Sequence, residues 1–166
     1  MKIAIDLGHG CPYDGGAVGV RREEDLINEV GEQLIEKLQQ LGHTAIKCRP
    51  SWAKSDTNSL WQRCNTANVN KADIFVSLHF NAYNGKAYGT ETFAISNAGR
   101  RIATSVQQEI CKLGFYNRGV KTTRYYVLRN TNMPAILIEG AFCDSKRDMK
   151  LFDAEKMADA IVRGLV

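Results

Sequence analysis

The sequence lacks several features that would assign its class at once. Its 166 residues hold only three histidines and three prolines, and no run of 18 or more apolar residues that could span a membrane. Its five cysteines form no Cys-x-x-Cys pair, which predicts free thiols rather than a disulfide framework or a structural zinc knuckle. Neither of the common glycine-rich phosphate-binding motifs is present, so nucleotide binding is not expected.

Charge and length indicate the kind of partner and the number of domains to expect. A net charge of +4 with scattered basic residues does not call for a nucleic-acid partner. A chain of 166 residues that is 44% hydrophobic predicts one domain with a real core, and we expect a monomer. The N-terminus begins a strand without an apolar leader segment. We therefore expect cytoplasmic synthesis with release by another route, or a domain excised from a secreted protein.

Hydrophobic periodicity predicts alternating strands and helices. Leu26, Val30, Leu34 and Leu38 recur at helical spacing, and Gly42 follows as a stop signal. Residues 73–80 are nearly continuously apolar, as expected for a strand buried on both faces. The pattern predicts an α/β fold, a twisted mixed but mostly parallel sheet flanked by helices in a single compact domain. The expected strands cover residues 2–7, 43–48, 73–80, 90–95, 125–128 and 135–139, and the expected helices cover 24–41, a short segment ending near 68, 100–113 and 149–166.

Three of these strands end at residues that can carry chemistry. His9 follows the first strand, His79 ends the central strand, and Glu139 ends the last one. Because ligands bind at the carboxyl ends of parallel strands, these residues are expected on one rim. Two histidines and one carboxylate form a known catalytic zinc set with the fourth position left for water, and Glu24 is our candidate for the carboxylate.

The adjacent carboxylates Glu23 and Glu24 compete for that role. Only one of them can point into a site from the start of a helix, because neighbouring helical residues diverge by about 100°. Asn28 lies four residues after Glu24, one helical turn away, and this spacing favours Glu24.

A set of ordered motifs carries a family resemblance from residue 3 to about residue 165. These motifs are Ile3-Ala4-Ile5-Asp6-Leu7-Gly8-His9-Gly10, Asp14-Gly15-Gly16-Ala17-Val18-Gly19, Glu24 with Asn28, Arg63 with Ala67-Asn68, Ala72 to Ala82, Gly89-Thr90-Glu91 and Pro134 to Glu139. Together they make the chain resemble zinc-dependent N-acetylmuramoyl-L-alanine amidases of the amidase-3 type.

The resemblance implies specific roles. His9, Glu24 and His79 would bind Zn²⁺, and Glu139 would serve as the catalytic acid and base. The implied reaction is hydrolysis of the amide between N-acetylmuramic acid and L-alanine, so peptidoglycan or its muropeptides would be the substrate at the bacterial cell wall. Residues 1–166 would form the catalytic domain, with no wall-binding module.

Other readings of single residues stay open in the sequence. Asn81 could contact substrate or hold its own loop, and Arg63 is expected to be structural. Glu91 is expected to be a strand residue at the cleft wall rather than a ligand. Cys143, four residues after Glu139, raises a cysteine-hydrolase alternative. The same site could also serve a zinc peptidase or deacylase, or a wall-binding relative without activity.

Overall fold

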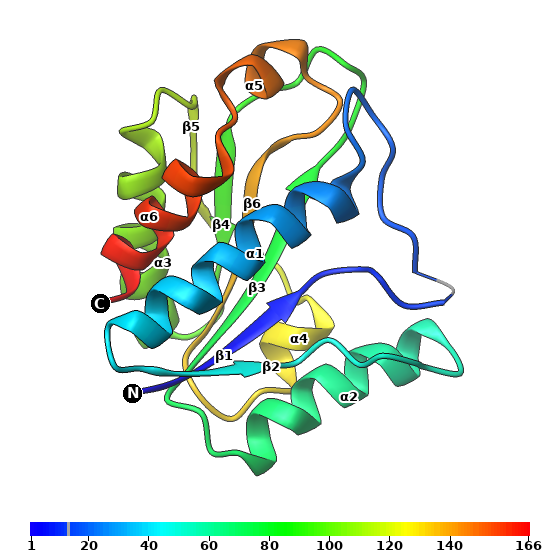
Figure 1. The fold of residues 1–166 in the computed structure, drawn as a ribbon, viewed down its shortest axis with the longest axis vertical. Coiled ribbons are helices and arrows are strands. Elements are labelled where there is room, and N and C mark those ends of the chain that lie inside the picture. The colour runs from blue at the N-terminus through cyan, green and yellow to red at the C-terminus, as the bar shows by residue number, and fades with distance from the viewer. Residues whose placement is uncertain (13) are drawn as a thin grey trace.

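Six strands form one mixed sheet with helices on both faces (Figure 1). A computed structural model describes residues 1–12 and 14–166 of the chain. The strands lie in the order β2-β1-β3-β6-β4-β5, and all neighbouring pairs are parallel except β4 with β6. The strand bounds are β1 Lys2–Leu7, β2 Thr44–Lys47, β3 Ile74–Asn81, β4 Thr90–Phe93, β5 Asn117–Lys121 and β6 Ala135–Phe142.

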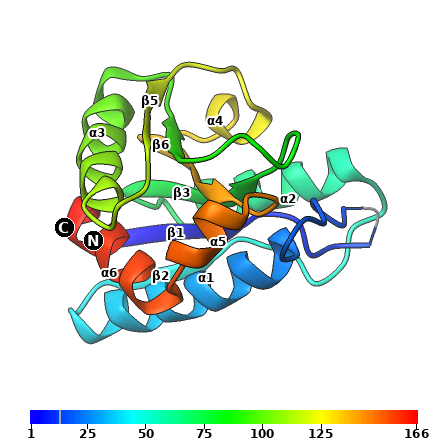
Figure 2. The same cartoon turned by 90° about the horizontal axis from the view of Figure 1, so that it is seen from above.

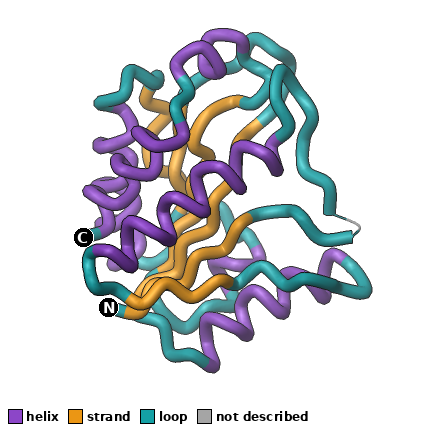
Figure 3. The backbone as a smooth tube through the Cα atoms, viewed as in Figure 1, coloured by secondary structure: helices purple, strands orange, loops and turns teal. Residues whose placement is uncertain are grey.

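The helices pack on both faces of this sheet, and Figure 3 marks them in purple against the orange strands. Helices α1, α3 and α6 cover one face, and α2 and α4 cover the other (Figure 2). The helix bounds are α1 Glu23–Gln40, α2 Asp56–Val69, α3 Asn97–Cys111, α4 Tyr126–Arg129, α5 Lys146–Leu151 and α6 Ala154–Leu165. Among the described residues, no helix combines the length and apolarity needed to cross a membrane.

Strand alternation divides the core in two. Ile3 and Ile5 of β1 pack with the helices of the first face, whereas Ala4 between them packs with α2 and α4. The central strands β1, β3 and β6 are buried on both faces, which explains why their sequences are apolar almost throughout. The expected fold class is confirmed.

Helix α1 follows its sequence signals closely. Leu26, Val30, Leu34 and Leu38 are fully buried against the sheet. Three acidic residues occupy its first turn, where they interact favourably with the helix dipole. The helix stops before Gly42, whose φ of 80° is readily adopted only by glycine.

Two sequence-based expectations were wrong in the second half of the chain. Residues 125–128 form no strand, because the Tyr125 carbonyl accepts hydrogen bonds from the amides of Leu128 and Arg129 and closes the short helix α4. The helix expected over residues 149–166 is two helices, since the Asp153 side chain caps α6 by accepting from the Lys156 amide at 3.0 Å.

Two further differences concern strands. Strand β5 was missed because its sequence, Asn-Arg-Gly-Val-Lys, has a single large apolar residue. Strand β6 does not end at Glu139 but continues to Phe142. Glu139 therefore lies within a strand, next to a register shift between β3 and β6 that falls between His79 and Asn81.

Candidate functional site

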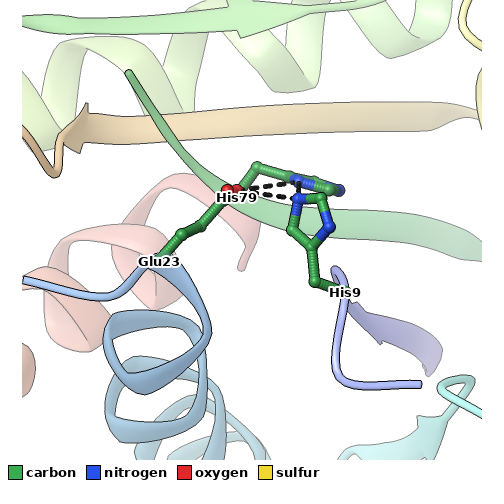
Figure 4. Close-up of side chains that lie close together, drawn as sticks. All are labelled: His9, Glu23 and His79. Atoms are coloured by element: carbon green, nitrogen blue, oxygen red, sulfur yellow. Dashed lines mark hydrogen bonds and ion pairs between the residues drawn. The ribbon is translucent and has the colours of Figure 1, made fainter. Parts of the chain in front are cut away.

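Three potential metal ligands from three separate elements meet at the carboxyl ends of β1 and β3. His9 lies just after β1, Glu23 is the first residue of α1, and His79 belongs to β3 (Figure 4). Glu23 Oε1 lies 3.0 Å from His9 Nε2 and 3.2 Å from His79 Nδ1, and the two imidazole nitrogens are 3.2 Å apart. The ligand atoms of a tetrahedral zinc ion with bonds of about 2.0–2.1 Å are separated by about 3.3 Å. The donor set and its spacing therefore fit one zinc ion.

This triad corrects the sequence-based choice of Glu24. Glu23, only 5% exposed, faces both histidines, whereas Glu24 turns away and lies 3.7 Å from Arg22 Nη2 as an ion pair. The physical reason is the 100° rotation per helical residue: a helix that begins at Glu23 can aim only that side chain at the sheet. Asn28, which favoured Glu24 in the sequence, has another partner described below.

Backbone amides fix the Glu23 carboxylate in place. The Ala17 amide donates to Glu23 Oε2 at 2.9 Å, and the Phe80 amide donates to Oε1 at 3.2 Å. Burial alone would raise the pKa of Glu23, but hydrogen bonds from His79, His9 and the Ala17 amide hold it well below its usual range. The carboxylate is thus kept ionised, the form that binds a metal.

Asp14 orients the first histidine. Its carboxylate accepts a hydrogen bond from His9 Nδ1, which turns Nε2 toward Glu23. Burial alone would lower the pKa of His9, but the hydrogen bonds and charges of Asp14 and Glu23 outweigh it and raise the pKa to about 10. A carboxylate behind a metal-binding imidazole is a common arrangement that fixes the ring and its tautomer. Sequence analysis missed this role of Asp14, although its place in the same glycine-rich loop was the available signal.

Two arginines hold the backbone that carries His9. Arg63, which is 1% exposed, donates to the Leu7 carbonyl at 2.5 Å, to the His9 carbonyl at 2.7 Å and to Asp6 Oδ1 at 2.6 Å. Arg49 donates to the Leu7 carbonyl at 2.8 Å and to the Gly8 carbonyl at 2.7 Å. Three consecutive carbonyls are thereby fixed. This support matters because His9 has a φ of 56°, a left-handed conformation that is costly for a residue with a Cβ.

Arg49 also joins two ligand-bearing elements. Its Nη1 donates to Asn28 Oδ1 of α1 at 2.7 Å, so one guanidinium contacts both the β1 end that precedes His9 and the helix that begins at Glu23. The contacts of Arg63 agree with the structural role that we expected for it. The hydrogen bond between Arg49 and Asn28 was not predicted from the sequence.

Glu139 of β6 lines the same cleft as the three potential metal ligands. It is the register partner of His79 on β3, and the two side chains line the same cleft. Its Oε2 is buried without a hydrogen-bond partner among the described residues. Burial, followed by the negative charges of Glu23 and Glu91, raises the pKa of Glu139 to about 8. A carboxyl group with such a pKa can both accept and donate a proton near neutrality.

Glu91 has a different environment from Glu139, its register partner across β4 and β6. It forms ion pairs with Lys121 and, at 3.1 Å, with Arg118, and it accepts from Asn81 Nδ2 at 3.0 Å. Glu91 is thus a buried strand residue with its charge compensated, and it is not one of the three potential metal ligands. Asn81 itself lines the cleft, and its Oδ1 accepts from the Ala82 amide at 2.9 Å.

The cleft around these groups has a volume of about 370 Å³. Its floor holds the triad and Glu139, and one wall comes from α2 and α4 through Leu60, Tyr126 and Val127. The cysteine-hydrolase alternative does not fit this geometry. Cys143 is fully buried in the core, and burial raises the pKa of its thiol to about 11, so it is not a ready nucleophile.

Comparison with known proteins gives one family match and several similar chains. The profile of one family, N-acetylmuramoyl-L-alanine amidase, matches residues 3–166. An uncharacterized cell wall amidase of Bacillus anthracis is 37% identical over 99% of this chain, and the protein YqiI of Bacillus subtilis is 35% identical over 98%. The chain spans 34% of the length of the first relative and 82% of the second.

A solved structure shares the fold over nearly the whole chain. The catalytic domain of the CD27L endolysin, which targets Clostridia difficile, superimposes with a TM-score of 0.91 at 30% sequence identity. The match covers 99% of this chain and 96% of that domain. The arrangement of strands and helices described above is therefore that of a known catalytic domain.

Proposed function

We propose that this chain, which belongs to the N-acetylmuramoyl-L-alanine amidase family, hydrolyses the amide bond between N-acetylmuramic acid and L-alanine in peptidoglycan. The bacterial cell wall is then its place of action. The observation that carries the proposal is the meeting of His9, Glu23 and His79 beside a buried, unpartnered Glu139 carboxyl oxygen in one cleft.

His9, Glu23 and His79 would hold one zinc ion. Bound there, zinc would supply Lewis-acid polarisation of the amide carbonyl and lower the pKa of the attacking water. Asp14 fixes the His9 ring, and the amides of Ala17 and Phe80 fix the Glu23 carboxylate, so these ligands are already oriented.

Glu139 would move the proton that the reaction requires. Its free Oε2 would accept a proton from the attacking water and deliver it to the amide nitrogen, which then leaves as the amino group of L-alanine. The raised pKa of Glu139 suits both halves of this transfer. Asn81 lies on the cleft wall beside this carboxyl and is our candidate for a substrate contact.

The test is digestion of purified muropeptides, with mass analysis of the products. The proposal expects a released peptide with a free L-alanine amino terminus and an intact sugar. Cleavage elsewhere in the stem peptide would instead indicate a peptidase, and loss of an acetyl group would indicate a deacylase.

The matched control is Glu139→Gln. This nearly isosteric change should retain zinc and the fold, yet lower turnover by on the order of 10²–10⁴-fold, because an amide cannot shuttle the proton. Zinc content, thermal unfolding and turnover are measured on one preparation. Turnover close to that of the unaltered protein would remove Glu139 from the mechanism, and loss of zinc would make it a ligand.

A further inference from the structure

A second hollow lies between α2 and α4, outside the cleft described above. It has a volume of about 160 Å³. Its most exposed large side chain is the Trp61 indole, of which 52% is accessible to solvent. The residues that line it are Trp61, Cys64, Asn65, Asn68, Tyr126 and Asn130.

This α2–α4 groove adjoins the cleft described above. Tyr126 lines both hollows, and Leu60 of the cleft wall directly precedes Trp61 of the groove. Helices α2 and α4 pack against each other on the same face of the sheet (Figure 1), so both hollows follow one seam. A ligand longer than one residue could therefore occupy the cleft and the groove together.

The groove walls are held by internal hydrogen bonds. Asn68 Nδ2 donates to the Asn130 carbonyl at 2.9 Å, and Asn68 Oδ1 accepts from the Asn132 amide at 2.9 Å. Asn130 Nδ2 donates to the Tyr126 carbonyl at 2.8 Å. The side chains of Asn68 and Asn130 are thus fixed before any ligand arrives, which reduces the entropy that these two residues lose on binding.

Other polar groups of the groove remain available. The Asn65 amide and the Tyr126 hydroxyl make no hydrogen bond to any residue that the structure describes. No charged side chain lines the groove. A half-exposed indole next to neutral donors and acceptors suits a neutral ring that has an apolar face and polar substituents. This is the chemistry of an N-acetylated sugar, and a carboxylate-bearing peptide would lack a cationic partner here.

We propose that the α2–α4 groove binds a sugar unit of the glycan strand, adjacent to the muramic acid whose amide is cleaved. The inference rests on the proposed function for the identity of the glycan. In this arrangement the sugar stacks on Trp61, and its hydroxyl or acetamido groups bond to Asn65 and Tyr126.

Tryptophan fluorescence tests this binding without any catalysis. The chain has two tryptophans, and Trp52, which is 61% exposed, lines neither hollow. In Trp52→Phe, Trp61 is the single indole reporter, and titration with triacetylchitotriose at millimolar concentrations should change its emission saturably. In Trp61→Phe, the remaining Trp52 should give no saturable change. An unchanged Trp61 signal, or equal changes in both variants, would overturn the proposal.

Kinetics supply the second test. Trp61→Ala should raise KM for a muropeptide with several sugars about tenfold more than KM for a muramoyl dipeptide, as expected for loss of one stacking contact of about 1.4 kcal/mol. Trp52→Ala serves as the control and should leave the ratio of the two KM values unchanged. Equal effects of Trp61→Ala on both substrates would contradict the groove as a sugar site.

The two proposals fail in different ways. If the unaltered protein released no peptide from either substrate, the proposed amidase function would fail, while the fluorescence titration would still report on the sugar site. If amide cleavage occurred but the Trp61 signal did not respond to the saccharide, only the sugar site would be rejected.

Discussion

Glu139 differs from Glu23 and Glu91 because no described residue forms a hydrogen bond with its Oε2. Glu91 has two cationic partners and Glu23 accepts from backbone amides, but Glu139 Oε2 is buried without a partner. A carboxylate in such a position destabilises the fold when it ionises. The residue that we propose as the proton carrier is therefore expected to lower stability.

This expectation has a definite pH dependence in the metal-free protein. Between the ordinary pKa of 4.5 and the folded-state pKa of about 8, folded Glu139 keeps a proton that the unfolded chain has lost. Stability attributable to this group therefore falls as pH rises through that interval. The glutamine of Glu139→Gln does not titrate. The free energy of unfolding of this variant should therefore rise relative to that of the unaltered protein as the pH increases from about 5 to about 8.

Urea unfolding with a chelator present measures this difference. Glu24→Gln is the control, because Glu24 lies outside the triad and has a cationic neighbour in Arg22. The free energy of unfolding of Glu24→Gln should differ from that of the unaltered protein by nearly the same amount throughout this pH interval. Suppose that the free energy of unfolding of Glu139→Gln differs from that of the unaltered protein by the same amount at about pH 5 and about pH 8. Glu139 would then not be protonated in the folded state over this interval.

The adjacent carboxylates give a second residue-scale prediction. Glu23→Gln should weaken zinc binding by more than about 100-fold, the upper range for residues that only support a ligand. Glu24→Gln should change zinc affinity little, since its side chain points away from the histidines. Competition with a chromogenic chelator measures both values. Stronger weakening in Glu24→Gln would return the ligand role to that residue.

The sequence predicted that His9, His79 and Glu139 lie on one rim, but it could not predict which side chain of the first turn of α1 points toward them. His9, His79 and Glu139 were predicted from apolar runs that end at or just before them. The parallel pairs β1–β3 and β3–β6 bring these positions together, although β3 and β6 continue beyond His79 and Glu139. Choosing between Glu23 and Glu24 requires the first residue of α1, and an error of one position rotates the side chain by about 100°. Asn28 misled the choice because its partner, Arg49, is 21 residues away in the chain.

At the scale of elements, the Arg49 guanidinium is the physical link between α1 and the end of β1. Arg49→Met should lower zinc affinity by about 10–100-fold, the range for residues that orient ligands. Arg49→Lys should restore only part of it, because an ammonium group cannot contact two carbonyls and an amide in a fork.

Chelator competition at equal protein concentration tests this link. Arg100→Met is the control, since Arg100 is exposed and its guanidinium donates, among the described residues, to Thr122 alone. A zinc affinity that Arg49→Met leaves unchanged, even with lowered thermal stability, would reduce Arg49 to a general stabilising residue.

The elements that were mispredicted share a cause. Residues 125–128 and strand β5 are short, and local sequence preference decides little over four or five residues. Tyr125 to Leu128 carry aromatic and branched side chains typical of strands, yet Val127 and Leu128 are buried because α4 packs against α2. Tertiary packing therefore overrides local preference there.

At the scale of the whole molecule, the three proposed zinc ligands come from segments separated by up to 70 residues. One zinc ion would therefore cross-link the fold and should raise its stability by mass action. At about a thousandfold excess over Kd, the gain is about 4 kcal/mol, or a rise in Tm on the order of 10 °C for a chain of this length.

Thermal unfolding with zinc and with chelator measures this shift. Glu23→Gln should show a much smaller shift, because it lacks one ligand. An equal shift in Glu23→Gln would mean that zinc stabilises the protein from another location.

The two ends of the chain lie near each other on the side of the sheet where β1 begins (Figures 1 and 2). The cleft lies at the opposite end of β1, a strand of six residues that spans about 20 Å. A segment fused to the N-terminus or to the C-terminus would therefore leave the domain on the side opposite the cleft. A single anchor on that side would leave the cleft facing outward, so the domain could be immobilised on a support or displayed on a particle without covering the site.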